Sequence, residues 1–126
     1  MHDKNKIVKN IFDLIDLAEQ HRLHCNDTEY EECVLEAVII SRNNYKRVSD
    51  DLERAYIDAL NKAVNCYINF GDDDIAEGKI MEDYNKSIEF ANEALDILND
   101  KDKLYPGARE WFNKAIEAVN KRIKAL

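Results

Sequence analysis

The stretch MEDYNKSIEFANEALDILN (81–99) decides the fold class of this chain. Its apolar and small residues recur every three or four positions, which places them in one stripe along a helix. The members of that stripe are Met81, Tyr84, Ser87, Ile88, Ala91, Ala94, Leu95 and Leu98. Because such a stripe is buried against another element, the segment predicts an amphipathic helix packed against neighbouring helices.

The same spacing returns in four other segments. The predicted helices cover about 5–24, about 29–47, from a cap at Ser49 or Asp50 to Phe70, about 79–99, and from Pro106 to Ile123. With three glycines and one proline, the chain lacks the turns that an antiparallel sheet requires. Short connections make consecutive helices antiparallel neighbours. We therefore predict an all-α fold of about five antiparallel amphipathic helices, stacked as helical hairpins in a single domain (1–126).

Local signals predict where these helices begin and end. Thr28 and Glu31 have the spacing of a capping box at the start of the second helix. Gly71 stands where a left-handed residue commonly ends a helix, here the third. The acidic segment DDDIAEG (72–78) is then the expected linker to the fourth helix. Pro106 suits the first turn of the fifth helix, where its missing N–H has no partner to lose.

Composition and charge limit the kinds of function. The net charge is −8, with 45% hydrophobic and 35% charged residues, which is typical of a globular protein. No apolar stretch approaches the roughly 20 residues of a membrane span, and no secretory signal is visible. Three cysteines, an odd number, do not make a disulfide framework, so a cytoplasmic location is expected. Acidic residues gather in 27–36 and 72–83, which disfavours direct nucleic-acid binding and favours a basic partner.

One part of the chain resembles a known repeat family. The second helix of a tetratricopeptide repeat typically carries an acidic-Tyr pair, a small residue, Ile, an aromatic residue and Ala-Leu. The block DYNKSIEFANEAL (83–95) has these types at Asp83-Tyr84, Ser87-Ile88, Phe90 and Ala94-Leu95. Upstream, LNKAVNCYINFGD (60–72) is similar to the family's first helix, and TEYEECVLEAVI (28–39) is a fainter match to the second. The spacing departs from the repeat of about 34 residues, because 73–83 is an insertion.

The resemblance implies a binding groove. In this family, residues of the first helix line a concave surface that takes a partner peptide. The corresponding positions here are Asp58, Asn61, Asn65 and Ile68. Asn65 is then expected to hydrogen-bond the peptide backbone, and the alternative for it is an ordinary solvated asparagine on an amphipathic helix.

The chain offers few ligands for a metal ion. His21 and Cys25 are one helical turn apart, but the four spaced ligands of a zinc site are missing from the sequence. The acids of 72–83 are similar in type to those of a calcium loop. A loop that begins at Asp73, however, places Ile75 where an oxygen ligand is required. We therefore expect no metal and no cofactor.

No catalytic arrangement is recognisable either. No histidine is preceded three positions earlier by glutamate, as di-iron bundles require, and no glycine-rich phosphate loop is present. Our leading hypothesis is a small, acidic, non-catalytic protein–protein interaction module. Its partner, a protein or peptide, would contact the groove positions or the acidic residues Asp72, Asp73, Asp74 and Glu77. The alternative is an immunity protein, antitoxin or phage anti-defence inhibitor whose acidic face blocks a basic nucleic-acid-binding partner.

Overall fold

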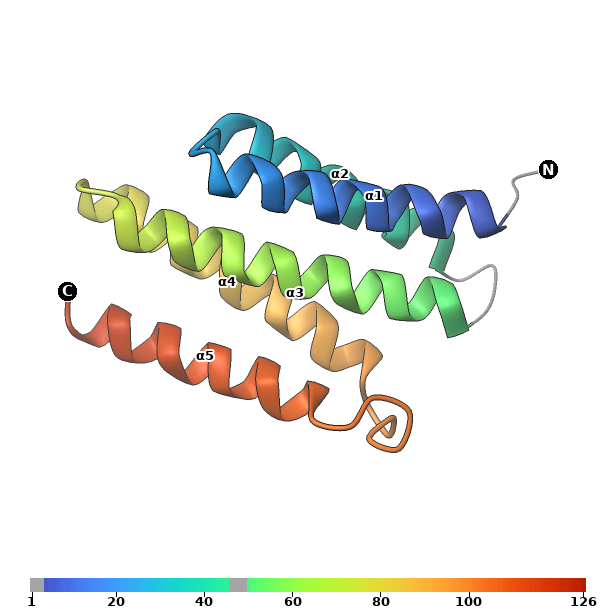
Figure 1. Ribbon diagram of the computed structural model, residues 1–126. Helices are drawn as coiled ribbons and strands as arrows, with labels where there is room; N and C mark the ends of the chain where they lie inside the picture. Colours follow the sequence, from blue (N-terminus) through green and yellow to red (C-terminus); the bar gives the residue numbers. More distant parts are fainter. Residues whose placement is uncertain (1–3, 46–49) are drawn as a thin grey trace. The chain divides into compact units, whose positions relative to one another are not determined.

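The computed structural model describes residues 4–45 and 50–126, and all the regular structure in them is helical (Figure 1). The helices are α1 (Lys4–Leu23), α2 (Asp27–Asn44), α3 (Asp50–Asp73), α4 (Glu77–Ile97) and α5 (Ala108–Lys124). The predicted all-α fold is confirmed. The chain divides into two compact units, 1–63 and 64–126, and the boundary falls inside α3. The organisation of 1–126 as one domain stays a prediction.

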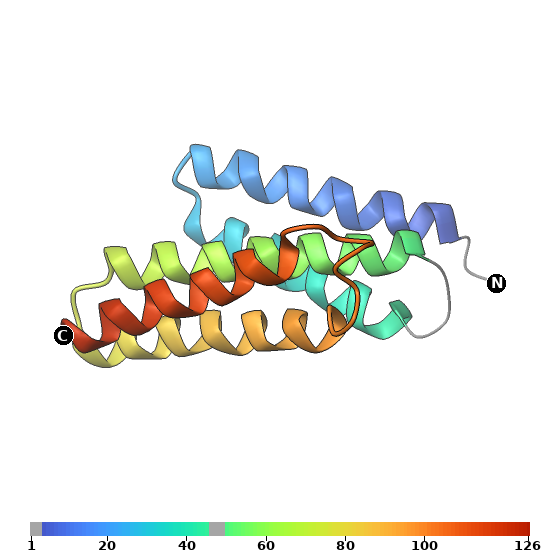
Figure 2. The same cartoon turned by 90° about the horizontal axis from the view of Figure 1, so that it is seen from below.

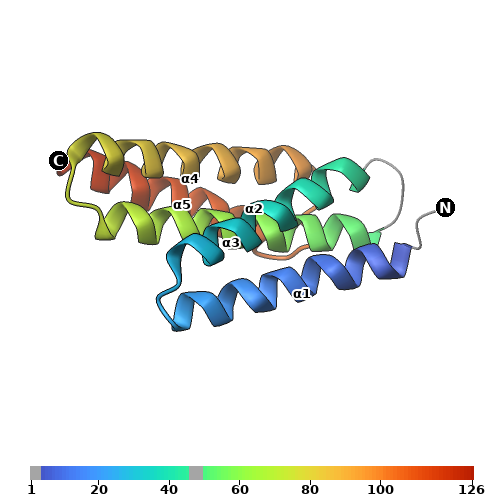
Figure 3. The same cartoon turned by 90° about the horizontal axis from the view of Figure 1, so that it is seen from above.

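In the first unit, α1 and α2 form an antiparallel hairpin (Figures 1 and 3). Its core consists of Ile11 and Ala18 of α1 and of Tyr30, Cys33, Val34, Ala37, Val38 and Ser41 of α2. The first part of α3 packs with this hairpin through an ion pair between Lys62 and Glu19 and through the rings of Tyr45 and Tyr56, whose centroids are 5.2 Å apart. Tyr56 and Leu60 are buried, as the helical stripe of this segment predicts.

The turn between α1 and α2 is made by backbone hydrogen bonds. Cys25 has a positive φ of 59°. The N–H groups of Asn26 and Cys25 donate to the carbonyl oxygens of His21 and Arg22, at 2.9 and 3.2 Å. This double closure is the Schellman arrangement that commonly ends a helix. This turn ends at Asn26, and α2 begins at Asp27. The predicted capping box at residue 28 is therefore wrong, and no side chain caps the start of this helix.

In the second unit, the later part of α3 packs against α4. The Ser87 hydroxyl donates to the Val64 carbonyl at 3.1 Å, and the rings of Tyr67 and Phe90 stack with centroids 5.8 Å apart. Ser87 and two alanines of α4 (Ala91, Ala94) are buried, and such small side chains permit close approach of two helices. Helix α5 returns antiparallel to α4 and buries Phe112 and Val119 (Figure 2).

Helix α3 does not end at Gly71. It continues to Asp73, so the predicted left-handed role of Gly71 is wrong. The glycine is required by packing instead, because a Cβ atom at this position would lie 2.4 Å from Cε1 of Tyr84. Carbon atoms that are not bonded to each other do not approach so closely, and the Tyr84 ring therefore occupies the space that a side chain at position 71 would need.

The predicted linker and the start of the fifth helix are also corrected. Between α3 and α4 only residues 74–76 lie outside the helices, so most of the predicted linker 72–78 is helical. Pro106 lies in a turn that precedes α5, and Gly107, with a positive φ of 79°, is the N-terminal cap residue of this helix. Helix α5 therefore begins two residues later than predicted. The predicted cap Ser49 lies outside the described residues.

Candidate partner-binding surface

The four groove positions share one face of α3. Asp58 is exposed, whereas Asn61, Asn65 and Ile68 are half-buried. Both asparagines already take part in interactions within the chain. Asp58 and Asn61 belong to the first unit and the other two residues to the second. Their role in a peptide groove stays a prediction.

Of the acids predicted to contact a partner, Asp72 is engaged within the second unit. Its carboxylate accepts a hydrogen bond from the Tyr84 hydroxyl at 2.6 Å and from Nε of Arg122 at 2.9 Å. Burial raises the pKa of Tyr84 to about 12, and the bond to the Asp72 carboxylate adds to that shift. These hydrogen bonds connect α3 to α4 and α5, so Asp72 stabilises the packing of these helices.

Oδ2 of Asp74 is buried, and this carboxyl group contributes to the raised pKa of the buried Asp83. Glu82 pairs with Lys79 and Lys86, at 3.8 and 3.4 Å. Asp73 and Glu77, by contrast, are exposed. Between them Ile75 is 98% exposed. The segment 72–83 therefore presents fewer available carboxylates than its composition indicates.

The acidic residues of α2 are arranged differently. Glu29, Glu32 and Glu36 recur every three or four positions, so they lie on one face of the helix, and all three are exposed. Among residues 4–45 and 50–126, no basic side chain pairs with any of them. The same face continues to Ile39, which is 51% exposed. We call these four residues the α2 acidic face.

On the other helices, several acids have a base one helical turn away. Lysine or arginine stands three or four positions from an acid in the pairs Lys9–Asp13, Arg22–Glu19, Lys86–Glu82, Lys114–Glu110 and Lys121–Glu117. On α2, glutamates stand at these same spacings, where like charges destabilise a helix by about 0.2–0.5 kcal/mol per pair. The α2 acidic face therefore has a cost in helix stability.

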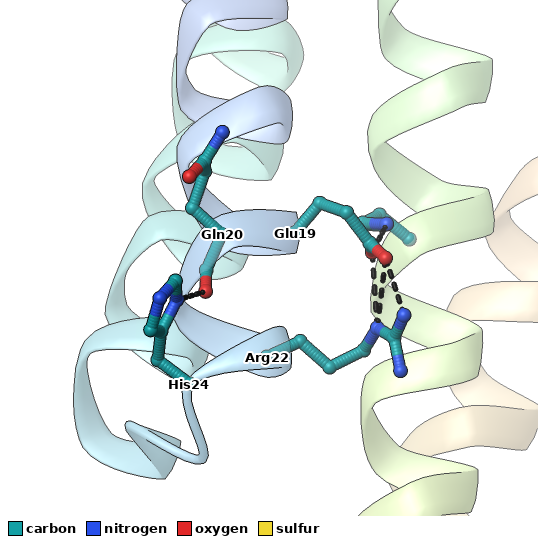
Figure 4. A network of polar contacts seen from close by, with 5 residues as sticks. Glu19, Gln20, Arg22 and His24 are labelled. Carbon is teal, nitrogen blue, oxygen red and sulfur yellow. Dashed lines mark hydrogen bonds and ion pairs between the residues drawn. The ribbon is translucent and has the colours of Figure 1, made fainter.

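The histidines and cysteines near the α1–α2 turn do not converge. Figure 4 shows His24 turned toward the backbone of Gln20, where its Nδ1 lies 2.8 Å from the carbonyl oxygen. Cys25 is exposed, and Cys33 is buried on α2. Burial raises the pKa of the Cys33 thiol, and the nearby Glu36, Glu32 and Glu29 raise it further, which opposes formation of a thiolate. In the described part of the chain, no three His, Cys, Asp or Glu side chains are grouped to hold a metal ion.

A polar hollow of about 410 Å³ lies beside the start of α5, and the sequence patterns do not predict it. Its lining consists of Asp102, Gly107, Arg109, Glu110, Asn113, Lys114 and Glu117. The charges pair with one another: Arg109 lies 3.6 Å from Asp102, and Lys114 lies 2.9 Å from Glu110. The remaining acid, Glu117, lies 3.7 Å from Lys121, so each charged side chain of the lining has a partner of opposite sign.

Within residues 4–45 and 50–126, no helix is long and apolar enough to cross a membrane. Comparison of the chain with protein-family models, with curated proteins and with solved structures finds no match. The resemblance to tetratricopeptide repeats accordingly stays a prediction.

Proposed function

We propose that this protein is a non-catalytic interaction module that binds a basic protein partner through the α2 acidic face. The observation that carries the proposal is the set of three exposed glutamates without a counter-ion among the described residues, next to the exposed side chain of Ile39. Unpaired carboxylates on one helix face attract a basic surface and accelerate its approach. An adjacent apolar side chain adds contact area that does not depend on salt.

The spacing of these carboxylates favours a basic helix over a nucleic-acid-binding groove. Glu36 follows Glu29 by seven positions, which is about 10 Å of helix, so successive charges lie about 5 Å apart along the axis. A DNA strand carries one phosphate per about 3.4 Å, which is denser. Lysines at three- and four-residue spacing on a partner helix would match the α2 acidic face directly. An inhibitor that imitates nucleic acid is therefore the second candidate.

Binding to a defined probe tests the proposal. The probe is an amphipathic helical peptide of about 20 leucine and lysine residues, measured by fluorescence anisotropy at low and high salt. We expect the double variant Glu32→Lys/Glu36→Lys to weaken binding about tenfold or more at low salt. Binding by the unaltered protein should weaken as salt screens the charges.

A matched control distinguishes the effect of the α2 acidic face on peptide binding from the effect of the protein's net charge. The variant Glu110→Lys/Glu117→Lys has the same change in charge, but both acids are already paired with lysines of α5. It should retain most of the affinity for the peptide. Equal losses in the two variants would mean that the peptide responds to net charge alone, and loss only on Asn65→Ala would point to the predicted groove. Copurification from the native host with both double variants then identifies the physiological partner.

A further inference from the structure

The joint between α3 and α4 contains a buried carboxyl group whose hydrogen bonding is incomplete. The side chain of Asp83 is 1% exposed. Its two carboxylate oxygens, and Oδ2 of Asp74, are buried without a hydrogen-bond partner among the described residues. A buried polar atom without a partner costs about 1–3 kcal/mol, and more if the group is charged. Three such oxygens in one place therefore call for a physical explanation.

Lys79 is a partial counter-ion for this site. Its Nζ lies 3.4 Å from Oδ1 of Asp83, beyond the usual length of a charge-assisted hydrogen bond. The lysine side chain is 50% exposed and also approaches Glu82 at 3.8 Å. The half-exposed ammonium group of Lys79 is shared between the carboxylates of Glu82 and Asp83, so it does not also neutralise Asp74. The charge at this joint is therefore not balanced when Asp74 and Asp83 are both ionised.

A side-chain hydrogen bond with Asp74 is among the causes that raise the pKa of Asp83, so the two carboxyl groups are neighbours. Two ionised carboxylates so close would repel, and neither would have a proton to donate. A single proton removes both difficulties, because a protonated carboxyl of Asp83 donates to the other carboxylate. The hydrogen-bond inventory of a carboxyl group allows this arrangement only when one of the two is neutral.

We propose that Asp74 and Asp83 share one proton in the folded protein and so form a pH-sensitive latch between α3 and α4. With the proton bound, the two side chains hold residues 74–76 against the start of α4. Loss of the proton leaves two like charges in a buried site, and the half-buried Asp74 is then free to turn outward to water. The latch is closed in acid and loosened as the pH rises.

The charged groups around the site act in opposite directions. Burial raises the pKa of Asp83, and Asp74 raises it further, whereas Lys79 on the same helix lowers it. On the neighbouring helices, Asp72 of α3 is paired with Arg122 of α5. A carboxyl whose folded pKa lies above its ordinary value of about 3.9 stabilises the fold below that value. That contribution is lost as the pH rises through the raised pKa.

The variant Asp83→Asn tests the latch, because an amide donates a hydrogen bond to Asp74 without needing a proton. We expect its thermal unfolding midpoint to match that of the unaltered protein near about pH 4 and to exceed it by several degrees at about pH 7.5. The control Asp96→Asn, at an exposed position of the same helix, should show no such divergence. A constant difference at all pH values would overturn the proposal.

Carboxyl NMR titration separates proton sharing from burial alone. In the unaltered protein the Asp83 carboxyl should titrate above an ordinary aspartate, and in Asp74→Asn its pKa should fall, because the like charge is replaced by a hydrogen-bond donor. An unchanged Asp83 pKa in Asp74→Asn would contradict sharing. So would a rise of the unfolding midpoint on adding about 10 mM CaCl₂ at neutral pH that disappears in Asp83→Asn, because the pair would then be a cation site.

Discussion

The contact between Gly71 and Tyr84 depends on the absence of a side chain at position 71, because the Tyr84 ring fills that space. The Tyr84 ring is buried over the backbone of α3, and its hydroxyl is held by Asp72. A ring that is buried and anchored at its far end has little freedom to move aside. The close approach at Gly71 is therefore a fixed feature of the packing between α3 and α4.

This contact reverses the usual effect of replacing a helical glycine. Alanine normally stabilises a helix interior by about 1 kcal/mol relative to glycine. Gly71→Ala should instead destabilise the protein by about 1–3 kcal/mol, because its Cβ atom would overlap the Tyr84 ring. Gly78→Ala is the matched control: it lies in α4 with no atom within 4 Å of its added Cβ, and it should be neutral or stabilising. Denaturant unfolding of both variants checks the prediction, and a stabilised Gly71→Ala would refute it.

The roles of individual residues were predictable only where their cause is local. The stripe of α4 and the burial of Phe112 follow from helical periodicity. The sequence pattern predicts a helix end at Gly71, whereas the actual reason for this glycine, the ring of Tyr84, lies on another helix. Asp72 was assigned to a partner surface because its counter-ion, Arg122, is fifty positions away in the chain. Sequence spacing cannot identify either of these tertiary contacts.

Helix α2 carries three exposed glutamates on one face, and none of them has a basic partner among the described residues. On the α2 acidic face, glutamates occupy the i, i+3 and i+7 positions without a base between them. The acidic composition of this segment was evident in the sequence. Composition does not show that these acids lack a partner in the described part of the chain, whereas those of 72–83 are largely engaged.

The same pattern predicts opposite effects on stability and binding. Glu32→Lys places a cation three positions after Glu29 and four before Glu36, so two repulsions become two attractions of about 0.2–0.5 kcal/mol each. The variant should therefore unfold at a higher temperature and bind the basic peptide less tightly. Calorimetry and anisotropy on the same sample measure the two effects. A variant that loses both stability and binding would show that Glu32 supports the fold instead.

The contact between α1 and α3 makes the stability of the first unit depend on pH. The Glu19 carboxylate is bonded to Arg22 and Lys62, and these bonds lower its pKa to about 2 (Figure 4). Its contribution is present above the ordinary glutamate pKa of about 4.3 and is lost as the pH falls toward 2. Because 36% of the side chain is exposed, solvent screening limits that contribution to about 1 kcal/mol.

Glu19→Gln should remove this dependence. Above about pH 5 the free energy of unfolding of the variant should be lower by about 1 kcal/mol than that of the unaltered protein. This difference should shrink toward zero as the pH falls toward 2. Denaturant titrations at a series of pH values measure it. The control is Lys9→Met, which breaks only an exposed ion pair within α1. It should leave the loss of stability in acid unchanged. A stability difference that grows in acid would contradict the assignment.

At the scale of the whole molecule, α3 is the element that both units use. The boundary between the units falls inside this continuous helix, and each part of it carries a bond to a neighbouring helix, Glu19–Lys62 in the first unit and Asp72–Arg122 in the second. Neither unit can unfold completely without melting part of α3. Because interrupting a helix removes backbone hydrogen bonds on both sides of the break, we expect the units to unfold together.

Trp111 provides the test, because it is the only tryptophan and lies in α5 of the second unit. Its fluorescence and the far-ultraviolet circular dichroism of all the helices should change at the same denaturant concentration. The decisive variant is Glu19→Gln, which alters only the first unit. If α3 couples the units, the Trp111 transition should shift by the same amount as the helical signal. A Trp111 transition that stays in place while the dichroism shifts would mean that the two units unfold separately, with α3 breaking near Val64.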